Sequence, residues 1–128
     1  MFKETIKYTD FDGNAREEDA YFHLSPAEMT QLQYSVQGGL KNELERAMKM
    51  QDGPAIMDFF VKIVEKAYGR KSADGRKFEK SAEIYNDFAQ TNAYVEFFMK
   101  LATNEAYMRK FVDGVMPDMD KYVTAPAT

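Results

Sequence analysis

The chain has 128 residues, of which 45% are hydrophobic, and this fits one domain with an ordinary core. It contains no cysteine, which excludes disulfide scaffolds, thiolate zinc sites and cysteine nucleophiles and fits a reducing cytoplasm. No apolar run reaches the ~20 residues that span a bilayer, and no signal-peptide pattern opens the chain. The formal net charge of −4 argues against nucleic acid as the main partner. We therefore expect a soluble intracellular protein with no membrane partner.

The beginning of the chain alternates between apolar and polar side chains with the period of a β-strand. One face of each of two strands carries the apolar residues Phe2, Ile6 and Tyr8, and then Ala20, Phe22 and Leu24. Between the strands, Asp-Phe-Asp-Gly-Asn at 10–14 supplies turn residues. A lone hairpin is marginal in water, so this pattern predicts an N-terminal β-hairpin that packs against helices.

Helical spacing of apolar residues begins at Ser25. Ser25, Pro26 and Glu28 have the spacing of a capping box with proline at the first helical position. The helical pattern breaks at Gly38–Gly39 and at 52–54. Further residues are expected at helix ends, namely Gly69 as a C-cap and Ser81, Thr91, and Thr103 or Asn104 as N-caps.

These signals predict an α+β fold, mostly α, with the hairpin packed on a bundle of about four to six short helices. Pro117 should end the organised region. We expect a single α+β domain at 1–117 and a flexible C-terminal tail at 118–128.

Candidate catalytic and ligand-binding motifs fail on spacing. His23 is the only histidine and has no orienting acid nearby, so a surface histidine is the simpler interpretation. Residues 10–14 resemble the start of a calcium loop, but Ala15 and Tyr21 stand where glycine and glutamate are needed. Gly-Arg-Lys-Ser at 69–72 lacks the upstream glycine and the preceding strand of a phosphate loop. We therefore predict no enzyme activity and no catalytic, cofactor-binding or metal-binding residue.

Two groups of side chains are candidates for partner binding. The segment 69–80 carries five basic and two acidic residues. Four of the basic residues are candidates for partner binding, namely Arg70, Lys71, Arg76 and Lys77, and the fifth basic residue is Lys80. This segment is either a solvated loop, which is the favoured interpretation, or a contact for an acidic partner surface. Seven aromatic residues lie at 85–111, which favours core packing with some rings at a partner surface, Tyr94 and Phe98 being the candidates.

Short motifs along most of the chain resemble a family of small phage proteins, the tail assembly chaperones of long-tailed phages. The motifs are YTDFDGN at 8–14, YFHLSPAE at 21–28, Gly38-Gly39-Leu40, AYGRKSADGRKF at 67–78, Gln90-Thr91-x-Ala93-Tyr94, Phe97-Phe98 and FVDGVMP at 111–117. The resemblance implies a factor of the host cytoplasm, not retained in the mature virion. It implies binding to the tape-measure protein, with tail-tube subunits as further candidates, during tail assembly. The family brings no catalytic residues.

A physical mechanism accompanies this resemblance. A groove rich in Met and Phe could cover the apolar stripes of a long helical protein reversibly, with a helix lying in the groove. The alternative is a small phage-encoded regulator or inhibitor that binds a host protein through the acidic N-terminal hairpin. The sequence does not indicate the oligomeric state.

Overall fold

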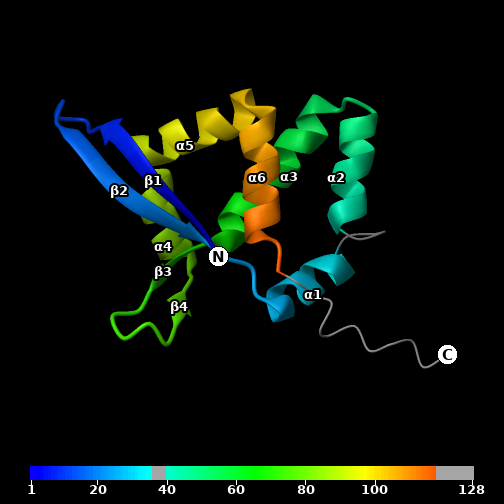
Figure 1. The fold of residues 1–128 in the computed structure, drawn as a ribbon, viewed down its shortest axis with the longest axis horizontal. Coiled ribbons are helices and arrows are strands. Elements are labelled where there is room, and N and C mark those ends of the chain that lie inside the picture. Colours follow the sequence, from blue (N-terminus) through cyan, green and yellow to red (C-terminus); the bar gives the residue numbers. More distant parts are fainter. Residues whose placement is uncertain (36–39, 118–128) are drawn as a thin grey trace.

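The computed structural model describes residues 1–35 and 40–117 of the chain (Figure 1). These residues form a mixed α+β fold in which helices make up more than half, as the sequence predicts. The elements are β1 (Phe2–Thr9), β2 (Ala15–Phe22), α1 (Pro26–Ser35), α2 (Leu40–Lys49), α3 (Gly53–Ala67), β3 (Tyr68–Lys71), β4 (Phe78–Glu79), α4 (Ala82–Ala89), α5 (Asn92–Thr103) and α6 (Glu105–Val115). The predicted break at Gly38–Gly39 and the predicted tail at 118–128 lie outside the described residues.

The four described strands form one antiparallel sheet in the order β1-β2-β3-β4. β1 and β2 pair along their whole length, from Phe2 opposite Phe22 to Thr9 opposite Ala15. β3 pairs with β2 only at Tyr21 and Phe22, so the turn end of the first hairpin extends beyond the rest of the sheet (Figure 1). The predicted N-terminal hairpin is therefore confirmed, within a larger sheet.

The turn of the first hairpin is held by the side chain of Asp10. Its Oδ1 accepts hydrogen bonds from the backbone N–H groups of Asp12 and Asn14, both at 2.9 Å, and its Oδ2 lies 2.6 Å from Arg16 Nε. Gly13 takes the positive φ of 84° that the turn needs. Phe11 at this turn is 81% exposed, and it contributes nothing to the core.

The segment between α3 and α4 is a second hairpin, and the prediction that Gly69 caps the preceding helix is wrong. Tyr68 is the C-cap residue of α3, and Gly69 lies in β3 opposite Tyr21. A Cβ at this position would lie 2.5 Å from the Phe78 ring and 2.8 Å from the carbonyl oxygen of Glu79. Glycine is needed here because β4 approaches closely, not because a helix ends.

Side-chain caps begin α1, α4, α5 and α6 at residues that the sequence predicts. The capping box of α1 is complete, since Glu28 N donates to Ser25 Oγ at 3.1 Å and Ser25 N donates to Glu28 Oε1 at 2.9 Å. Of the two candidates for the last cap, Asn104 is used, through Oδ1 and the N–H of Tyr107. Ser81 and Thr91 are the N-caps of α4 and α5, as predicted, and Asp52 at the predicted break is the N-cap of α3.

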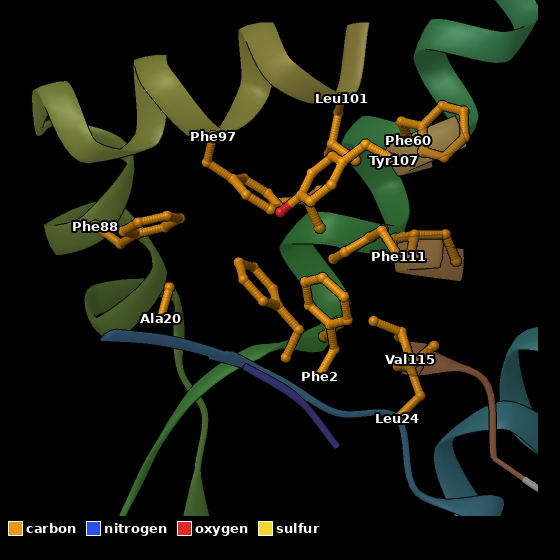
Figure 2. Close-up of a cluster of buried hydrophobic side chains, with 14 of the residues drawn as sticks. Phe2, Ala20, Leu24, Phe60, Phe88, Phe97, Leu101, Tyr107, Phe111 and Val115 are labelled. Carbon is orange, nitrogen blue, oxygen red and sulfur yellow. The ribbon is translucent and has the colours of Figure 1, made fainter. Parts of the chain in front are cut away.

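The core lies between the sheet and the helices and is mainly aromatic. Figure 2 shows Phe2, Phe97, Tyr107 and Phe111 pointing toward one another from β1, α5 and α6. Phe22 of β2 is fully buried, and its ring stacks on Phe97 with the centroids 4.6 Å apart and the planes 14° apart. The Phe22 ring also contacts those of Phe2, Tyr68, Phe88 and Phe111. This ring therefore joins the sheet to α4, α5 and α6.

Lys80, directly after β4, connects three distant parts of the chain. Its Nζ donates to the carbonyl oxygens of His23 and Lys66, at 2.6 Å and 2.8 Å, and to Glu28 Oε2 at 2.7 Å. Glu28 therefore serves both the capping box of α1 and this ion pair. Lys80 is half-buried and bonded within the protein, whereas the other four cations of this segment are exposed.

Candidate functional site

The four candidate cations lie together on the second hairpin. Arg70 and Lys71 are in β3, Arg76 and Lys77 are in the turn that precedes β4, and all four are exposed. Lys71 Nζ lies 4.6 Å from the centre of the Tyr21 ring, and Lys77 Nζ lies 4.0 Å from Glu79 Oε2. All four cations are therefore exposed on the second hairpin, and their contact with a partner stays a prediction.

The turn between these cations is ordered by its own side chains. Asp74 Oδ1 accepts hydrogen bonds from Ser72 Oγ at 2.7 Å and from the N–H of Arg76 at 3.0 Å. Gly75 has a φ of 75°. The hydrogen bond from Ser72, and after it the one from the N–H of Arg76, lowers the pKa of Asp74 below its ordinary value. The hairpin thus presents the cations on a defined backbone.

The two candidate rings, Tyr94 and Phe98 of α5, are half-buried and stack on each other with centroids 5.6 Å apart. Tyr94 also contacts Phe88 and Tyr85 of α4. Among the seven aromatic residues at 85–111, four are buried and three are half-buried. Core packing therefore accounts for most of these rings, and a partner contact by Tyr94 and Phe98 stays a prediction.

His23 is half-buried just beyond β2, where the sequence favours an exposed strand surface. Burial lowers the pKa of His23, and the N-terminal ammonium group and Lys80 lower it further. Its ring meets the Phe78 ring edge-on at 5.8 Å, and Nδ1 has no hydrogen-bond partner among the described residues. Across residues 1–35 and 40–117, no group of three or more His, Asp or Glu side chains could hold a metal ion.

A groove of about 680 Å³ lies among α1, α2, α3 and α6. Phe59 and Phe60 of α3 are buried beneath it, at 3% and 4% exposure. Its apolar lining is completed by Met29 of α1, Leu44 and Met48 of α2, Met108 and Val112 of α6, and Met116 and Pro117 beyond α6. We call this feature the methionine groove. Except for Met29, which is buried, these remaining apolar residues are half-buried, so the groove offers a hydrocarbon and thioether surface to a ligand.

Local sequence patterns give little sign of this groove. Its apolar residues come from four helices and the segment just after α6, between positions 29 and 117, and they meet only because the helices pack together. The one available signal is composition, since nine methionines in 128 residues favour an adaptable apolar surface. That signal indicates a Met-rich groove without showing which methionines line it.

A family model described as phage tail assembly chaperone matches residues 1–125. The chain belongs to that family. Neither a curated protein nor a solved structure matches this chain. The family is non-enzymatic, and membership in it implies tail proteins as partners of this tail assembly chaperone. In the described part of the chain, no helix is long and apolar enough to cross a membrane.

Proposed function

We propose that this tail assembly chaperone binds the tape-measure protein in the host cytoplasm and takes apolar helical segments of it into the methionine groove. The observation that carries the proposal is the groove itself, in which four methionines surround a floor made by Phe59 and Phe60. Tail-tube subunits are a second class of client.

The groove suits a chaperone that must both bind and release. Methionine side chains are unbranched and polarizable, so they adapt to apolar side chains of different shapes. A helix that lies across α3, between the walls made by α2 and α6, would bury its apolar stripe against this surface (Figure 1). Because each contact is small, many copies could cover a long client and leave it one at a time.

Co-expression tests the proposal. Segments of the tape-measure protein should stay soluble and co-purify with the chaperone, because the groove covers their apolar stripes. Met48→Glu with Met108→Glu should lower the recovered client by about tenfold, since an unpaired carboxylate would be buried against the helix. The client recovered in the soluble fraction is the measurement.

The matched control is Val95→Glu with Met99→Glu, which adds the same charges at exposed positions of α5. This variant should recover as much client as the unmodified protein. Equal loss of client in both variants would contradict a role for the groove. Recovery of a host regulatory or defence protein in place of tail proteins would favour the inhibitor alternative.

The second hairpin, with its four exposed cations, is a second proposed contact, which would attract an acidic region of the client. Arg70→Glu with Arg76→Glu should weaken complex formation about tenfold at low salt and less at high salt, because salt screens attraction between exposed charges. Binding measured at both salt concentrations tests this, with Lys7→Glu and Lys62→Glu as a control of equal charge change. If the two variants behave alike, the hairpin is only a solvated turn.

A further inference from the structure

The walls of the methionine groove carry an excess of negative charge. Glu45 of α2 and Asp113 of α6 line it from opposite walls, and both are exposed. The other charged lining residue, Arg109, lies 3.1 Å from Glu105, four residues earlier on α6. Within residues 1–33 and 42–117, neither Glu45 nor Asp113 forms an ion pair.

We infer that the groove selects amphipathic helices in which Lys or Arg borders the apolar stripe, an inference that rests on the proposed function. A helix with its stripe on Phe59 and Phe60 would turn the residues beside that stripe toward α2 and α6. Basic residues at these places would meet Glu45 on one side and Asp113 on the other. Acidic residues there would meet like charge at both Glu45 and Asp113.

The apolar and the charged side chains of the groove recognise different features of a client helix. The methionines accept many combinations of apolar residues, so they discriminate weakly among apolar stripes. Charge complementarity at the edge of an interface contributes more to specificity and association rate than to affinity. The chaperone is thus tolerant of the apolar sequence of a client helix and selective for the charges beside it.

Two designed helical peptides with the same leucine stripe are the probes, one with Lys and the other with Glu at every position that borders the stripe. The Lys peptide should bind about tenfold more tightly at low salt, and the ratio should shrink at high salt. Glu45→Lys with Asp113→Lys should reverse the preference. Fluorescence anisotropy of the labelled peptides measures both affinities.

Glu83→Lys with Asp87→Lys is the control, because it makes the same change in net charge on the exposed side of α4. This variant should keep the preference for the Lys peptide. Equal binding of both peptides by the unmodified protein would overturn the charge inference and leave the groove as the docking site. Failure to bind either peptide, or binding that Met48→Glu with Met108→Glu leaves unchanged, would overturn the groove proposal itself.

Discussion

Phe22→Ala should lower the free energy of unfolding by about 3–5 kcal/mol, which is a large share of the total stability of a small domain. The Phe22 side chain is fully buried and contacts rings from β1, α4, α5 and α6. Its loss would leave a cavity that the surrounding aromatic rings are too rigid to fill. Urea unfolding at neutral pH, followed by circular dichroism, gives the value.

Phe11→Ala is the matched control, because the same side chain is 81% exposed at the turn of the first hairpin. Its effect on the free energy of unfolding should stay within ~0.5 kcal/mol. Similar losses in the two variants would show that the core is not arranged around Phe22.

Lys80→Met should lower the free energy of unfolding by about 2–3 kcal/mol. The variant keeps the apolar part of the side chain and removes all three hydrogen bonds of Nζ, to the carbonyl oxygens of His23 and Lys66 and to Glu28. Those acceptors would then lose a charged donor in a half-buried place. Lys62→Met, at an exposed position of α3, should have almost no effect.

The pH dependence of stability separates this role of Lys80 from simple packing. Burial raises the pKa of Glu28, but hydrogen bonds from Lys80 and Ser25 outweigh it, so the pKa lies below its ordinary value of 4.5. A lowered folded-state pKa adds stability above the unfolded-state pKa, and this contribution is lost as the pH falls through the folded-state pKa. In Lys80→Met the loss of stability below pH 4.5 should be smaller; an unchanged acid dependence would contradict the ion pair.

Local signals predicted much of the fold because they act over a few residues. Each of these signals depends on neighbours a few residues away in the sequence. They are the alternation in the first strand, the capping box at Ser25 and Glu28, and the caps at Thr91 and Asn104. The pairing of β3 with β2 depends instead on Gly69 meeting Tyr21, which is far away in the sequence. A glycine that follows a helical stripe has the sequence pattern of a C-cap, so this strand was missed.

The candidate site was less accessible to sequence reasoning than the fold. The cations from Arg70 to Lys77 are adjacent in the sequence, so their grouping could be predicted, although their place on a hairpin could not. The methionine groove depends on the packing of helices that contribute Met29, Met48 and Met108 from separate segments. No spacing rule joins such positions, and only the tertiary structure identifies them.

Site-specific crosslinking tests the central claim most directly, because the chain has no cysteine and each introduced cysteine is therefore unique. A photoreactive group on Val112→Cys would lie in the groove, and one on Thr5→Cys would lie on an exposed position of β1. In the purified complex, we predict crosslinks from position 112 to apolar helical segments of the tape-measure protein, and few from position 5. Equal crosslinking from both positions, or crosslinks from position 5 alone, would contradict binding in the groove.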